Sequence, residues 1–224
     1  MPQVISFIGH HNSGKTTLIR KIARNLTKKN FKIGIIKSTK HYLCTNHKEG
    51  SDTWLYHQDG ITDISIACPD GFVHFKPKDD FDLFYLAFSL FPQVDLLLCE
   101  GFKHAKGIKK IEVARKEVST ELLKNKVDGV IAVVADFEIK GVKSFRFEDV
   151  SKICDFMIES LNLSSQESFS IDLFVNKRRI PLKRFVRDSL KNTVYGYVQS
   201  LKFTENAKEI ELRIKLSGVE ESTK

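Results

Sequence analysis

The chain has 224 residues, of which 42% are hydrophobic and 29% are charged. This length suits one α/β domain with a small appendage, and no apolar run reaches the roughly 20 residues that a membrane-spanning helix needs. The formal net charge of +8 favours an anionic partner such as a nucleotide, a phosphorylated cofactor, a nucleic acid or an acidic protein.

Apolar runs alternate with helical patterns through most of the chain. We expect strands at 3–8, 32–37, 63–69, 72–75, 94–100, 108–115 and 128–136, and helices at 14–28, 79–91 and 147–161. The strand at 108–115 is expected at an edge, and 63–69 is expected to pair with 72–75 across Pro69-Asp70-Gly71. This alternation predicts an α/β, P-loop NTPase-like fold: a mostly parallel sheet with helices on both faces.

The composition changes near residue 162. We expect a nucleotide-binding domain at 1–162, a Ser-rich linker at 163–168, a C-terminal module at 169–217 and a disordered tail at 218–224. The module is predicted to be β-α-β: a strand, a turn at NKRR (176–179), a helix beginning at Pro181, and a final strand at 209–216.

The four cysteines form no C-x-x-C pair and are interpreted as free thiols: Cys44, Cys68, Cys99 and Cys154. Cys99 lies within VDLLLCEG, which is typical of a buried strand. The first residues show no basic region followed by a long apolar stretch, so we expect a cytoplasmic protein.

The clearest motif is GHHNSGKT, which fits G-x-x-x-x-G-K-[ST] between an expected strand and an expected helix. Backbone N–H groups of such a loop surround phosphate oxygens, and the positive end of the helix faces the anion. In this motif the lysine, Lys15, bridges phosphates and the hydroxyl of Thr16 holds Mg²⁺. The predicted phosphate-binding residues are Gly9, His10, His11, Asn12, Ser13, Gly14, Lys15, Thr16 and Thr17.

A Mg²⁺ site also needs a carboxylate near the loop. Glu100 and Asp95 both belong to the strand VDLLLCE, but ligands of parallel sheets bind at the carboxyl ends of the strands. Glu100 lies at that end and is the predicted Mg²⁺ acid. Asp95 lies roughly 16 Å away, at about 3.3 Å per residue, and is expected only to begin the strand.

The segment 37–53 follows the second strand and is therefore expected on the nucleotide side. It is long, basic and contains histidine, which suits a loop that closes over a ligand. Asp52 is a candidate second Mg²⁺ ligand or water-positioning acid, and Lys37, His41 and Lys48 are candidate phosphate contacts; a solvated loop with incidental charges is the alternative.

Taken in order, five stretches resemble the molybdopterin-guanine dinucleotide biosynthesis protein B family: FIGHHNSGKTTL, IGIIKSTKHY, HKEGSDTWLYHQDG, DLLLCEGFKH and KIEVAR. The resemblance covers about residues 1–160. It implies a GTP-binding adaptor that uses Mg²⁺, hydrolyses GTP slowly at most, and is commonly a homodimer. It also implies action beside the molybdopterin guanylyltransferase that joins GMP to molybdopterin.

By position, the resemblance assigns Gly9 to Thr17 to the phosphate loop and Asp52 to the closing loop. It assigns Glu100, Gly101 and Lys103 to a second motif on the phosphate side. The sequence departs from the family in its His-His-Asn loop and in KSTKHY. The region from 169 onward resembles an extension present in only some relatives.

The residues singled out so far do not distinguish GTP from ATP. Asp136, after the strand VIAVVA, is the candidate to accept hydrogen bonds from guanine N1 and N2; capping of a turn is the alternative.

Other functions remain open. A metallochaperone GTPase is suggested by His10, His11, His41 and His47, and a small-molecule kinase by the loop class alone. In the C-terminal module, NKRRIPLKRFVR holds six basic residues and suits a nucleic-acid or protein docking surface. We favour instead a solvated basic helix face with an apolar side that packs on the domain or across a dimer.

Overall fold

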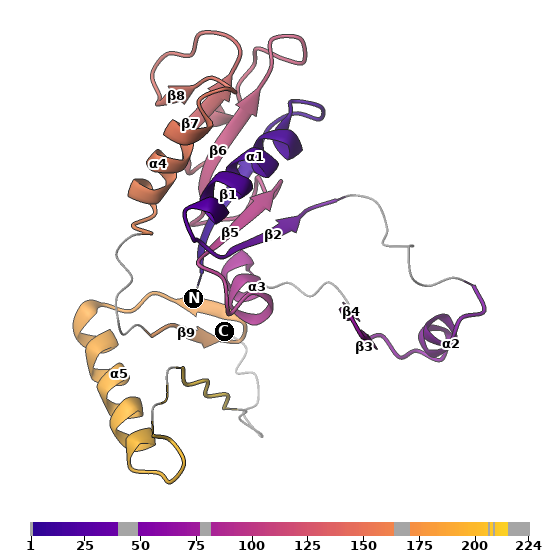
Figure 1. Cartoon of the computed structure of the whole chain (residues 1–224), viewed down its shortest axis with the longest axis vertical. Helices are drawn as coiled ribbons and strands as arrows, with labels where there is room; N and C mark the ends of the chain where they lie inside the picture. The colour runs from indigo at the N-terminus through magenta and orange to yellow at the C-terminus, as the bar shows by residue number, and fades with distance from the viewer. Residues whose placement is uncertain are drawn as a thin grey trace, which may run out of the picture. The chain divides into compact units, whose positions relative to one another are not determined.

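The computed structural model describes residues 2–39, 49–76, 82–163, 171–205, 207 and 209–214 (Figure 1). The chain divides into two units. The first comprises Met1–Ser168 with Phe174–Ile180, and the second comprises Phe169–Leu173 with Pro181–Lys224. The expected tail lies outside the described residues, as does the expected linker apart from residue 163.

A six-stranded, fully parallel sheet forms the centre of the first unit, as the alternation of elements predicted. Its order is β2 (Ile33–Lys37), β5 (Leu96–Glu100), β1 (Gln3–Ile8), β6 (Lys109–Ala114), β7 (Val130–Ala135) and β8 (Ser144–Phe145). Because all six strands run the same way, their carboxyl ends meet at one edge, which is where parallel sheets bind ligands.

Helices cover both faces of this sheet. Ile5 and Phe7 of β1 face α1 (Lys15–Lys28) and α4 (Val150–Ser160), and belong to the larger buried cluster. Val4 faces the other way and packs with Leu83 and Ala87 of α3 (Leu83–Leu90). Successive strand residues point to opposite faces, so continuous apolar runs bury both faces at once.

The prediction that residues 108–115 form an edge strand is wrong. This strand, β6, lies inside the sheet between β1 and β7. The charges of Lys110 and Glu112 suggested an edge, yet both residues are buried. The ammonium group of Lys110 donates to three backbone carbonyl groups, and the carboxylate of Glu112 accepts from two backbone N–H groups. Hydrogen bonds to backbone groups thus make the buried charges tolerable in an interior strand.

A second part of the first unit consists of α2 (Asp52–Gln58) and an antiparallel hairpin of β3 (Ile64–Cys68) and β4 (Gly71–Phe75). The hairpin was predicted; the helix was not. Ser51 caps α2 by accepting from the N–H of Trp54 at 3.4 Å, which starts the helix within residues expected to form a loop. A 3₁₀ turn, η1, covers Leu123–Asn125.

The C-terminal elements differ in part from the predicted β-α-β order. β9 (Leu173–Val175) and β10 (Arg178–Ile180) form a two-stranded sheet, and α5 (Arg184–Gln199) follows. The helix begins three residues after Pro181 because Lys183, the residue before it, is still extended. Within the described residues 209–214 there is no strand, since that segment lacks a strand to pair with.

Three cysteines are free thiols, as predicted: Cys68, Cys99 and Cys154. Burial in the apolar core raises the pKa of Cys99 to about 12 and that of Cys154 to about 11. Cys44 lies outside the described residues.

The interior position of β6 predicts a large difference between two isoleucine truncations. Ile111→Ala empties a fully buried site in β6 and should lower the free energy of unfolding by about 2 to 5 kcal/mol. Ile35→Ala, in the edge strand β2 where the side chain is 49% exposed, should cost about 1 kcal/mol or less. Urea unfolding followed by circular dichroism measures both; equal losses would contradict this strand order.

Candidate functional site: a phosphate loop at the carboxyl edge of the sheet

The glycine loop joins the end of β1 to the start of α1, and two glycines shape it. Gly9 has φ +150° and Gly14 has φ +90°. A Cβ atom at Gly9 would lie 2.2 Å from the carbonyl oxygen of Val113 in β6, so only glycine fits there. Gly14 begins α1 with no side-chain cap, which leaves the first-turn N–H groups without a side-chain acceptor. This is the arrangement that binds an anion at a helix N-terminus.

The side chain of Lys15 folds back over this loop. Its ammonium group donates to the carbonyl oxygens of Gly9 at 3.1 Å and His10 at 2.6 Å, and lies 3.5 Å from Oγ of Ser13. Burial lowers the pKa of Lys15, while the nearby carboxylate of Glu100 acts in the opposite direction. The cation is therefore held within the loop by weak neutral acceptors, and an anion would bind it more strongly.

The other loop positions differ in exposure. Ser13 is buried and His10 half-buried, whereas His11, Asn12, Thr16 and Thr17 are exposed. Asn12 has φ +60°, a conformation that asparagine tolerates better than most side chains. The exposed positions leave the loop's outer side accessible to a ligand.

Thr16 and Glu100 meet at the carboxyl ends of β1 and β5. The Thr16 hydroxyl lies 3.0 and 2.9 Å from the two carboxylate oxygens of Glu100, and Nζ of Lys37 lies 3.1 Å from one of them. The register explains this convergence, because Phe7 and Lys37 both pair with Glu100 across the sheet. A nearly buried carboxylate next to a hydroxyl group offers the hard oxygen ligands that Mg²⁺ prefers.

A sharp turn follows Glu100 and fixes its direction. Gly101 has φ +96°, and its carbonyl oxygen accepts a 2.5 Å hydrogen bond from Oγ of Ser6. A Cβ atom at Gly101 would lie 3.1 Å from Cβ of Ser38, so the turn packs closely on the end of β2. In contrast, Asp95 lies before β5 begins, where its carboxylate accepts from the N–H of Lys32 at 2.8 Å.

The remaining predicted phosphate-side residues are not joined to this group by contacts of the described residues. Asp52 is the exposed first residue of α2, and Lys103 is exposed in the turn after Gly101. His41 and Lys48 lie outside the described residues. All four stay predictions.

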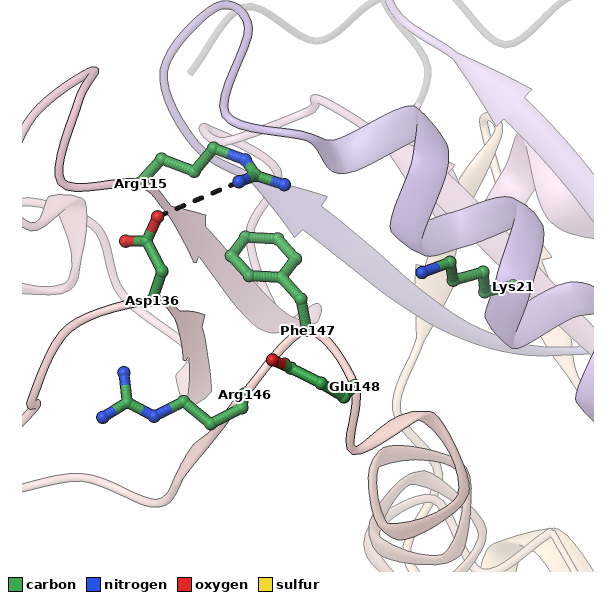
Figure 2. Close-up of a pocket in the computed structure, with 6 residues that line it drawn as sticks. All are labelled: Lys21, Arg115, Asp136, Arg146, Phe147 and Glu148. Atoms are coloured by element: carbon green, nitrogen blue, oxygen red, sulfur yellow. Dashed lines mark ion pairs between the residues drawn. The ribbon is translucent and has the colours of Figure 1, made fainter.

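Asp136 lies at the end of β7 and lines a cavity of about 570 Å³ with Lys21, Arg115, Arg146, Phe147 and Glu148 (Figure 2). One carboxylate oxygen accepts from the N–H of Lys116 at 2.8 Å, which is the turn cap that the sequence left open. The other lies 3.8 Å from the guanidinium group of Arg115. Asp136 thus keeps one oxygen directed toward the cavity side while the other holds a turn.

Sequence reasoning missed Arg115 and Phe147. The Arg115 guanidinium lies 4.2 Å from the centre of the Phe147 ring, and both groups lie within 3.5 Å of a Cβ built on Gly14. Arg115 directly follows β6, which lies beside β1. A correct strand order would therefore have placed Arg115 next to the phosphate loop. Phe147 follows β8, which has two residues and is too short to show a strand pattern.

No group of three or more His, Cys, Asp or Glu side chains suited to a metal ion occurs among the described residues. None of the helices in this described part of the chain is long and apolar enough to cross a membrane.

A parallel sheet with a glycine loop after β1 and an acid at the end of the neighbouring strand defines a P-loop NTPase-like α/β protein. Residues 4–136 match the family described as molybdopterin guanine dinucleotide synthesis protein B, or MobB. The chain therefore belongs to the MobB family.

Relatives with adapter descriptions match most of the chain. A molybdopterin-guanine dinucleotide biosynthesis adapter protein of Escherichia coli is 28% identical over 165 residues, which are 71% of this chain and 93% of that protein. A Methanocaldococcus jannaschii protein, described as a "putative molybdopterin-guanine dinucleotide biosynthesis adapter protein", is 24% identical and matches 96% of this chain and 98% of its own length. Most of the C-terminal region thus has a counterpart in that relative.

Solved structures agree with the fold. A crystal structure of molybdopterin-guanine biosynthesis protein B aligns with a TM-score of 0.56 and 26% identity, over 70% of this chain and 99% of that one. Bacillus subtilis MobB aligns with a TM-score of 0.54 and 23% identity, over 71% and 98% of the two chains, and supports the fold alone.

The close approach at Gly9 predicts a loss of stability in Gly9→Ala beyond the cost of its backbone conformation. Gly141→Ala is the matched control, because Gly141 also has positive φ but its nearest atom is a flexible lysine Nζ 3.9 Å away. We expect about 1 kcal/mol of destabilisation for the control and at least about twice that for Gly9→Ala, measured by urea unfolding. Equal losses would show that the loop does not press against β6.

Proposed function

We propose that the chain is a GTP-binding adapter in the biosynthesis of molybdopterin guanine dinucleotide, and that it works with the guanylyltransferase. The observation that carries this proposal is the Lys15–Thr16–Glu100 arrangement at the phosphate loop of a MobB-family chain. The similarity to molybdopterin-guanine dinucleotide biosynthesis adapter proteins supports the adapter role.

The phosphate loop fits the triphosphate of a nucleotide. The uncapped first turn of α1 supplies backbone N–H donors, and Lys15 supplies a cation whose hydrogen-bond acceptors among the described residues are neutral oxygens. Thr16 and Glu100 would hold Mg²⁺, which neutralises phosphate charge when bound. Lys37 already places a positive charge beside the Glu100 carboxylate, so this position accommodates a cation.

Hydrolysis is proposed to be slow. Phosphoryl transfer depends mainly on positioning and charge, and none of the described residues at the loop is a clear base for an attacking water. The bound nucleotide therefore acts as a signal to a partner or as a delivered substrate, and a partner protein would complete any faster reaction.

The proposal also includes a homodimer and a cytoplasmic setting. The part of the first unit that holds α2, β3 and β4 exposes large apolar side chains, among them Phe72 at 77% and Tyr56 at 50%. Exposed apolar groups gathered on one segment suit a protein–protein interface. Molybdopterin is the further ligand that this function would bring to the complex.

The proposal predicts that Lys15→Ala weakens GTP binding at least about 100-fold, because a charge-assisted contact to phosphate is lost. Lys28→Ala is the matched control: it removes the same charge from the exposed last turn of α1, and should leave the affinity unchanged. Calorimetric titration with GTP and Mg²⁺ measures both variants, and circular dichroism checks their folding. A folded Lys15→Ala variant with unchanged GTP affinity would remove the site assignment.

A further inference from the structure

The cavity beside the phosphate loop has the position and the chemistry of a nucleotide-base pocket. Its residues follow β6, β7 and β8, on the opposite side of β1 from Glu100 and Lys37. The Arg115 and Phe147 side chains come within 3.5 Å of a Cβ built on Gly14, the residue that begins α1. A ligand whose phosphates occupy the loop would therefore reach this cavity with its other end.

The cavity offers an aromatic face and an acceptor. The Phe147 ring is half-buried and lies against Gly14, and the Asp136 carboxylate is fixed by its hydrogen bond from the N–H of Lys116. A volume of about 570 Å³ is that of a small-molecule site. Aromatic rings stack on any base, so the carboxylate must supply the preference between bases.

The present occupant of the Phe147 face indicates which base fits. The planar Arg115 guanidinium lies over the ring, 4.2 Å from its centre, and approaches the Asp136 carboxylate at 3.8 Å (Figure 2). The N1–H and C2-amino group of guanine form the same chemical fragment: a flat carbon with neighbouring N–H donors. Adenine would instead turn the acceptor N1 toward the carboxylate, which is repulsive.

We propose that this cavity is a guanine pocket in which the Phe147 ring stacks on the base and Asp136 accepts from guanine N1 and N2. Arg115 occupies the pocket before the nucleotide binds, and the base displaces its guanidinium group. This inference rests on the proposed GTP binding and names the residues that select the base.

Exchanging the hydrogen-bonding pattern at Asp136 tests the proposal. Asp136→Asn replaces two acceptors by one donor and one acceptor, which suits xanthine, where a carbonyl replaces the C2-amino group. We expect GTP affinity to fall about tenfold or more and XTP affinity to rise by a similar factor. Glu148→Gln, the other carboxylate that lines the cavity, is the matched control and should keep the wild-type order of GTP and XTP.

Inorganic tripolyphosphate separates the failure of this inference from the failure of the proposed function. It uses only the phosphate loop, so its affinity should be the same in wild type and Asp136→Asn, which also shows that the variant is folded. Wild-type protein that binds neither GTP nor tripolyphosphate would overturn the nucleotide site itself. Normal GTP binding with no change in Asp136→Asn, or a switch in Glu148→Gln instead, would overturn only the guanine pocket.

The displacement of Arg115 has its own readout. If the base must displace the Arg115 guanidinium group, that step lowers the apparent affinity of the base. Removing the Arg115 side chain should therefore increase the contribution of the base to GTP affinity. Arg115→Ala also removes a positive charge near the phosphates, which weakens GTP and tripolyphosphate alike. The ratio of the two affinities is therefore independent of that loss and reports on the base. We expect this ratio to rise about threefold or more in Arg115→Ala; a lower ratio would show that Arg115 supports the base rather than competing with it.

Discussion

The contact on which the rest of the site depends is the close approach of Gly9 to the carbonyl oxygen of Val113. β1 and β6 are neighbours, so the chain that leaves β1 must turn immediately beside the end of β6. A residue without a Cβ atom permits that turn, since any Cβ would lie 2.2 Å from the carbonyl oxygen. The turn then sets the path to Gly14 and the open first turn of α1. The anion-binding geometry is thus a consequence of packing between two neighbouring strands.

Parallel strands bring all the candidate groups to one edge and divide them between two sides of β1. Lys37 and Glu100 end β2 and β5 on one side, where a phosphate-bound cation is expected. Arg115, Asp136 and Phe147 follow β6, β7 and β8 on the other side, where a base is expected. A nucleotide lying across the loop would contact both sides, which makes each half of the site testable separately.

The sequence predicted most strands of the parallel sheet because they are mainly apolar runs, and it predicted the loop because the glycine spacing is local. It failed where the outcome depends on more than the apolar pattern of the element itself. The interior position of β6 depends on backbone groups outside the strand that satisfy Lys110 and Glu112: the carbonyl group of Asp128 and the N–H group of Leu123. The cavity at Phe147 depends on β8, whose two residues carry no pattern of their own. The start of α5 was misjudged because Lys183, the residue before the helix, is still extended.

The most direct test of the account is binding of the intact protein to a molybdopterin guanylyltransferase. Purified partners would be titrated with GTP and Mg²⁺, with ATP and Mg²⁺, and without nucleotide. We predict binding that responds to GTP and not to ATP, because the proposed guanine pocket would accept only the guanine nucleotide and the loaded site would be the form that the partner binds. Binding that is absent under all three conditions, or that is the same with ATP as with GTP, would contradict it.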